Sequence, residues 1–172
     1  MLRAGGSSTF RSPEDASTVE VWFYHLQRRP LEATLPNLVE RSIARGWTAV
    51  IQAASPERLA ALDDLLWTYD DSSFLPHGSA RDGDASVQPV WLTTEEDNPN
   101  SASVRFFVEG ADAPAALANA ECAPKERAIV MFDGRDEDAL NIARMQFRTL
   151  RERGFALSYW RQNDDGRWEK TA

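Results

Sequence analysis

Short runs of β-branched and aromatic residues alternate along this chain with longer segments whose apolar residues recur every three or four positions. The short runs are typical of buried strands, and the periodic segments are typical of amphipathic helices. Strands separated by helices usually assemble in parallel, so the pattern predicts an α/β fold with a mostly parallel sheet between two helical layers. The predicted strands are residues 19–26, 47–52, 89–93, 104–108, 128–132 and 155–160.

Three helices are expected between these strands. The first runs from Leu31 to about residue 43, with Pro36 near its first turn and Gly46 as its stop. The second begins at Ser55, which is followed by proline and glutamate, the usual composition of a helix N-terminus. The third opens at Asp136 and ends near residue 154.

The chain has the length of one domain, and no linker divides it. Residues 1–17 are rich in Gly, Ser and Arg without periodicity, and are expected to be a disordered extension. Residues 18–162 form the predicted α/β domain, and residues 163–172 are expected to be a polar tail.

Charge and cysteine usage narrow the class of protein. With 27 acidic and 19 basic residues, the net charge is −8, which disfavours nonspecific binding to nucleic acid. The lone Cys122 cannot form an internal disulfide, which is typical of a reducing cytosol. No apolar run is long enough to span a membrane, and residues 1–17 lack the apolar stretch of a secretory signal. We therefore expect a cytoplasmic protein.

The motifs of nucleotide binding are missing. Neither Gly-x-Gly-x-x-Gly nor Gly-x-x-x-x-Gly-Lys-Ser/Thr occurs, and the connection after the first strand, residues 27–30, reads Gln-Arg-Arg-Pro without a glycine. The α/β fold is therefore expected to lack a phosphate-binding loop.

Candidate catalytic and metal-binding residues are few. His25 ends a predicted strand and is expected to be structural, whereas His77 would need a nucleophile and a carboxylate beside it to act in catalysis. Cys122 has no neighbouring cation and is expected to be an inert thiol. The acidic segment 133–138 lacks the glutamate that closes a calcium loop, and its simpler role is to start a helix. We expect no catalysis, no metal and no cofactor.

The predicted third helix carries the most informative feature. Arg144, Arg148 and Arg151 share one face of it, with Phe147 on the flank. One interpretation is a favourable interaction of the arginines with the helix dipole. The other is a docking groove in which arginines bind the carboxylates of an acidic peptide and an aromatic residue holds an apolar anchor. The residues alone leave both interpretations of the arginines open. Trp67 and Phe74 are equally open, because large aromatic residues at these places can either cover the core or contact a partner.

Several of these segments together resemble a known family. The run 62–67 (Leu-Asp-Asp-Leu-Leu-Trp), the run 73–77 (Ser-Phe-Leu-Pro-His), Phe-Asp-Gly at 132–134 and the helix around Phe147 resemble the chi subunit of the bacterial DNA polymerase III holoenzyme. The resemblance covers residues 19–161 and is strongest with the alphaproteobacterial branch.

The resemblance implies a Rossmann-like fold without nucleotide binding and a non-catalytic adaptor of the clamp loader. It implies that the acidic C-terminal tail of single-stranded-DNA-binding protein binds at Arg144, Phe147, Arg148 and Arg151. A second face at Trp67, Phe74 and Pro76 would take the psi subunit or an iron–sulfur helicase, and DNA would be contacted only indirectly. The alternatives are a small nucleotide- or metal-dependent hydrolase and a direct DNA binder.

Overall fold

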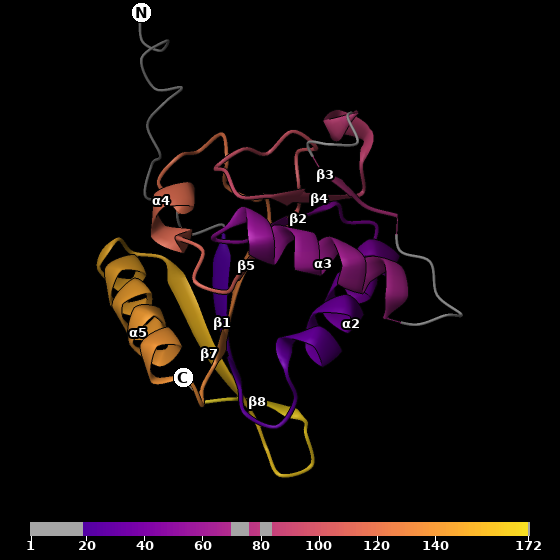
Figure 1. The fold of residues 1–172 in the computed structure, drawn as a ribbon. Helices are drawn as coiled ribbons and strands as arrows, with labels where there is room; N and C mark the ends of the chain where they lie inside the picture. Colours follow the sequence, from indigo (N-terminus) through magenta and orange to yellow (C-terminus); the bar gives the residue numbers. More distant parts are fainter. Residues whose placement is uncertain (1–18, 70–75, 80–83, 172) are drawn as a thin grey trace, which may run out of the picture.

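A computed structural model describes residues 19–69, 76–79 and 84–171, so the predicted N-terminal extension lies outside the described residues. Helices and strands alternate as expected (Figure 1). The strands are β1 (Glu20–Leu26), β2 (Ala49–Gln52), β3 (Gly78–Ser79), β4 (Val90–Thr93), β5 (Val104–Val108), β6 (Arg127–Asp133), β7 (Ala156–Gln162) and β8 (Trp168–Lys170). The helices are α2 (Leu31–Ala44), α3 (Pro56–Thr68), the 3₁₀ turn η2 (Ala85–Val87), α4 (Ala113–Leu117) and α5 (Glu137–Glu152).

The strands form one sheet in the order β3-β4-β2-β5-β6-β1-β7-β8. Every neighbouring pair is parallel except β7 and β8, which confirms the mostly parallel sheet. β1 lies between β6 and β7, so that Phe23 is opposite Val130 on one side and Tyr159 on the other. The carboxyl ends of β5, β6 and β1 therefore meet at the same edge of the sheet.

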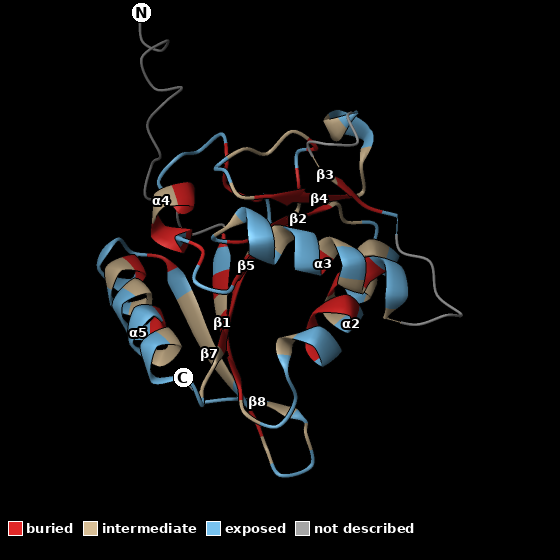
Figure 2. Ribbon diagram, viewed as in Figure 1, coloured by how far each residue is buried: buried red, intermediate tan, exposed pale blue. Residues whose placement is uncertain are grey.

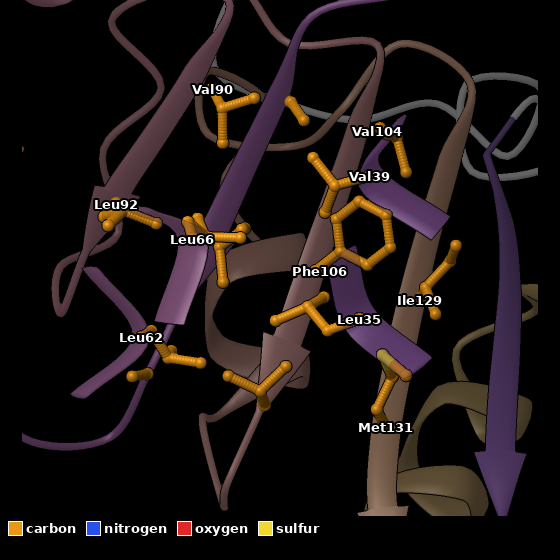
Figure 3. Packing of buried hydrophobic residues seen from close by; sticks show 14 of the residues in the cluster. Leu35, Val39, Leu62, Leu66, Val90, Leu92, Val104, Phe106, Ile129 and Met131 are labelled. Carbon is orange, nitrogen blue, oxygen red and sulfur yellow. The ribbon is translucent and has the colours of Figure 1, made fainter. Parts of the chain in front are cut away.

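Helices cover both faces of the sheet, which confirms the three layers (Figures 1 and 2). α2 and α3 pack on one face, where Leu35 and Leu66 contribute to the larger core cluster drawn in Figure 3. α4 and α5 pack on the other face, where Leu117 and Leu150 join a second cluster around Phe23. The central strands are buried on both sides, which explains their nearly unbroken apolar sequence.

α2 begins at Leu31, as predicted, but its proline lies deeper in the helix than expected. Pro36 lies in the second turn of this helix and not in the first, and it is buried against the core. Its ring removes one backbone hydrogen bond there. The bond lost at Pro36 is offset by apolar burial along the same face, where Leu35 and Val39 are fully buried.

The C-terminal segment is also different, because the predicted polar tail contains strand β8. Gly166, with a φ of +81°, lies in the turn that reverses the chain after β7, and Trp160 is paired with Lys170. The ring of Trp168 packs 4.4 Å from that of Tyr24 in β1. Backbone pairing with β7 and the packing of one large aromatic residue thus attach an otherwise polar segment to the domain.

Candidate functional site

α5 is held in place by its cap and by one buried side. The Asp136 carboxylate accepts hydrogen bonds from the backbone N–H groups of Asp138 and Ala139, at 3.0 and 3.3 Å. Ala143 and Leu150 face the core, and their burial fixes the rotation of the helix about its axis. The two flanks of α5, on either side of this buried face, therefore point in opposite directions.

One flank carries the predicted basic residues. Arg144, Arg148 and Arg151 are all exposed on α5, at the i, i+4 and i+7 spacing that aligns side chains. We call these three residues the arginine flank. Phe147 lies beside them but points inward, where its ring packs edge-on against Phe23 with a centroid distance of 5.1 Å. The structure thus brings the four predicted residues together at one place.

Phe147 also borders a group of rings contributed by three adjacent strands. Its centroid lies 6.1 Å from that of Tyr159 in β7, and Tyr159 in turn lies 5.8 Å from His25 in β1. Phe132 in β6 completes the group at 5.1 Å from His25. We call Phe147, Tyr159, His25 and Phe132 the aromatic cluster, which lies directly beside the arginine flank.

His25 connects this cluster by hydrogen bonds. Its Nδ1 lies 2.6 Å from the Tyr159 hydroxyl, and its Nε2 lies 3.3 Å from the amide nitrogen of Gln27. Because an amide nitrogen can only donate, Nε2 of a neutral ring accepts and Nδ1–H donates to the Tyr159 oxygen. The hydroxyl hydrogen of Tyr159 is then left to donate to an acceptor other than His25.

The surroundings of His25 disfavour its charged form. Burial lowers its pKa from the usual value of 6.5, and the charges of Arg161 and Arg144 lower it further, while Asp133 acts in the opposite direction. Burial raises the pKa of Tyr159, against the influence of the same two arginines. Both arginines are therefore close enough to act on the cluster. His25 itself is buried, as expected for a residue in this strand.

Tyr159 and Arg161 also lie at the site, although they were not expected there from the sequence. What brings such residues to the site is the register of the parallel strands, in which His25 is opposite Arg161 and Phe132. Side chains that are paired across adjacent strands project from the same face. Strand order would have to be known before the sequence could bring these residues together.

In the loop between β1 and α2, a protein side chain binds two backbone amides. The backbone N–H groups of Arg28 and Arg29 both donate to Oε1 of Gln162, at 3.1 Å each. Gln162 is buried at the end of β7. In nucleotide-binding α/β folds, backbone amides after the first strand face the pyrophosphate, whereas here a protein side chain occupies two of them.

Trp67, the main residue of the predicted second face, is 54% exposed at the end of α3. Its ring lies 4.5 Å from that of His77, and the buried His77 has its Nε2 3.0 Å from the carboxylate of Asp63. Pro76 is exposed next to them, and Phe74 lies outside the described residues. His77 is thus paired with a carboxylate below an exposed tryptophan.

The remaining candidates have structural partners. Cys122 is buried, donates to the backbone oxygen of Glu96, and has its pKa raised by burial. The Asp133 carboxylate accepts from the backbone and side chain of Arg135, which lowers its pKa. Within the described ranges, no three His, Cys, Asp or Glu residues cluster closely enough to hold a metal ion. None of the helices described is both long and apolar enough to cross a membrane.

These features define a class of α/β domain whose first loop is closed by a side chain and whose fifth helix presents arginines beside an aromatic cluster. The chain belongs to the family described as DNA polymerase III chi subunit, HolC, whose model matches residues 19–158. It is a family of replication proteins, as the sequence resemblance indicated.

One relative agrees with this assignment, and one solved structure shares the fold. The chain is 28% identical over 149 residues to the "Probable DNA polymerase III subunit chi" of Rickettsia prowazekii (strain Madrid E), covering 87% of this chain and 90% of that protein. Its fold is similar to the C-terminal domain of the DEAD-box protein Dbp5, with a TM-score of 0.53, 15% identity and coverage of 88% and 93% of the two chains. At that identity the second likeness concerns the fold alone.

Proposed function

We propose that this protein is a non-catalytic accessory subunit that binds the acidic C-terminal tail of single-stranded-DNA-binding protein and links it to the clamp loader. The tail would lie along α5, with its carboxylates on Arg144, Arg148 and Arg151 and its last aromatic residue against Phe147. The observation that carries this proposal is the position of the exposed arginine flank directly beside a half-buried aromatic cluster.

The chemistry of the two parts fits one ligand. Guanidinium groups bind carboxylates with charge-assisted hydrogen bonds, which are the stronger kind. Aromatic rings pack favourably edge-to-face, as Phe147 already does with Phe23. In a chain of net charge −8, three exposed arginines on one flank attract a short anionic peptide locally, whereas a nucleic-acid strand would also meet the surrounding carboxylates.

Two further residues extend the proposed tail site. Arg161 is opposite His25 in the strand register, and its charge, like that of Arg144, acts on both His25 and Tyr159. The hydroxyl hydrogen of Tyr159 is directed away from His25 and suits a carboxylate oxygen. We place the terminal carboxylate of the tail near Arg144, Arg161 and this hydroxyl.

The second face around Trp67 is the proposed contact for the psi subunit or a helicase. A tryptophan that is half exposed at a helix end and packed on a buried histidine is rigid, and rigid aromatic residues are enriched at interface centres. The two faces are on different helices, α3 and α5, so both partners can be bound together.

Calorimetric titration with a C-terminal peptide of the cognate single-stranded-DNA-binding protein tests the tail site. We expect saturable binding that weakens at high salt and disappears when the final aromatic residue of the peptide is removed. Trp67→Ala should leave this binding unchanged. A folded protein that does not bind the intact peptide would refute the proposal.

A further inference from the structure

A crevice lies beside α5, on the flank of this helix opposite the arginines. The crevice, with a volume of about 500 Å³, opens at the carboxyl ends of β1, β5 and β6, between the N-terminal turns of α2 and α5. In open α/β sheets this is the place where ligands usually bind. The crevice is thus a candidate site separate from the arginine flank, because none of Arg144, Arg148 and Arg151 lines it.

The inner surface of the crevice is apolar. Leu26, Leu31, Phe107 and Met131 are among the side chains that line it. Ile142 of α5 also lines the crevice, and its side chain is 42% exposed. Met145, one turn further along α5, is 65% exposed, so apolar surface continues from the crevice onto the outside of the helix. An occupant therefore has an apolar part and extends beyond the crevice.

The rim of the crevice is acidic. Five carboxylates and two arginines line it: Glu32, Glu109, Asp133, Asp136 and Asp138, with Arg58 and Arg135. Both arginines already have partners. Arg58 lies 3.5 Å from the Glu109 carboxylate, and Arg135 lies 3.2 Å from that of Asp133. The excess charge at the rim is therefore negative, and it attracts a cation.

The hydrogen-bonding groups in the wall of the crevice also favour a positively charged occupant. Gln146 donates through its amide nitrogen to the backbone oxygen of Ala111 at 3.1 Å. Its Oε1 is buried and has no hydrogen-bond partner among the described residues. The wall thus contains one acceptor without a partner, which agrees with an occupant that donates hydrogen bonds.

We propose that this crevice binds a basic protein segment, in which an apolar side chain enters the crevice and flanking lysine or arginine residues pair with the acidic rim. A nucleotide or another anion is disfavoured, because it would meet five carboxylates and the loop amides already bound by Gln162. α5 would then serve two partners of opposite charge, one on each flank.

The test uses the full chain labelled with ¹⁵N and three seven-residue peptides, followed by amide chemical shifts. The first peptide has a central leucine between lysines and arginines, the second has glutamates in place of all basic residues, and the third has glycine in place of leucine. We expect the first to shift the amides of Gly110, Ala139 and Ile142, and the third to bind at least threefold more weakly. The glutamate peptide should leave those amides unshifted.

A matched pair of variants tests the rim. Glu32→Gln with Asp138→Asn should weaken binding of the basic peptide at least fivefold, while Glu121→Gln with Asp165→Asn, at exposed positions outside the crevice, should not change it. Equal affinity in the two double variants would overturn the proposal. So would shifts of the same crevice amides on adding inorganic phosphate. Binding of the single-stranded-DNA-binding protein tail is measured in parallel, and its failure would count against the tail site alone.

Discussion

The imidazole ring of His25 occupies the space that a Cβ atom at residue 134 would need. A Cβ built on Gly134 lies 1.8 Å from Nε2 of His25, far inside van der Waals contact. The two backbones are close as well, because the Gly134 N–H donates to the Leu26 oxygen at 2.8 Å. The glycine in the Phe-Asp-Gly sequence at 132–134 is therefore required by the histidine on the neighbouring strand.

Gly134→Ala should destabilise the protein by about 1–3 kcal/mol, because the added methyl group overpacks the site and displaces the His25 ring. In the His25→Ala background the same substitution should cost much less, since the smaller side chain makes room. Urea unfolding of the four proteins of the cycle measures the coupling. Additive effects of the two substitutions would show that the close approach is not what constrains residue 134.

The pH dependence of stability should report on His25. Its pKa is lowered in the folded protein, so the unfolded chain binds the proton more tightly. The free energy of unfolding should therefore fall as the pH drops below about 6.5, by at most about 1.4 kcal/mol per pH unit for this one proton. Thermal unfolding between pH 7.5 and 5.5 measures this change in the free energy of unfolding. The His25→Leu variant should lack the part of the pH dependence that comes from His25. His77 is present in both proteins and cancels in the comparison.

Arg105 should matter for stability although it lies outside all three proposed binding surfaces. It is buried, donates to Gln52 Oε1 through Nε and Nη2 at 3.1 and 2.6 Å, and donates to the backbone oxygens of Asp97 and Glu95. Arg105→Met leaves those acceptors unpaired and should cost about 2–4 kcal/mol. Arg105→Lys keeps the charge but not the planar geometry, and should lie in between. Denaturant midpoints would decide, and wild-type stability in the methionine variant would contradict this account.

Trp168→Ala should destabilise the whole domain, by about 2–3 kcal/mol, because the indole packs on Tyr24 in the central strand. The measurement is the midpoint of a single cooperative transition followed by far-ultraviolet circular dichroism. An unchanged midpoint would mean that β8 is only an appendage of the sheet.

Arg144→Ala should weaken binding of the tail peptide about tenfold, as expected for a lost charge-assisted hydrogen bond. Arg135→Ala removes an equal charge near the opposite flank of the same helix and should weaken it less than twofold. Isothermal titration at fixed salt compares the two. Equal losses would indicate that net charge, rather than the arginine flank, governs affinity.

Elements with strong local patterns could be predicted from the sequence. The leucine stripe of α3 and the apolar runs of β1 and β6 are confirmed with boundaries shifted by one or two residues. α4 was not indicated, because five residues of mostly alanine and proline carry no periodicity. β8 was missed because its three residues contain one apolar side chain, Trp168, and its pairing with β7 leaves no local pattern.

The candidate site was predictable only where one helix carries it. Arg144, Phe147, Arg148 and Arg151 are neighbours by helical spacing alone. The contributions of His25, Tyr159 and Arg161 depend on which strands are adjacent, and pairing between distant strands leaves no local trace in the sequence. The closure of the first loop by Gln162 could not be predicted either, because Gln162 is distant from that loop in the sequence.

The central position of β1 has a consequence for how the protein is made. His25 and Tyr159 are 134 positions apart, and β1 finds its two neighbours only in the second half of the chain. In the order of synthesis, β1 therefore emerges before both strands that pair with it, and its pairing cannot be completed until β6 and then β7 have been translated. Nascent chains stalled before β7 should expose this strand to chaperones, and a premature stop anywhere before it should leave no stable fragment.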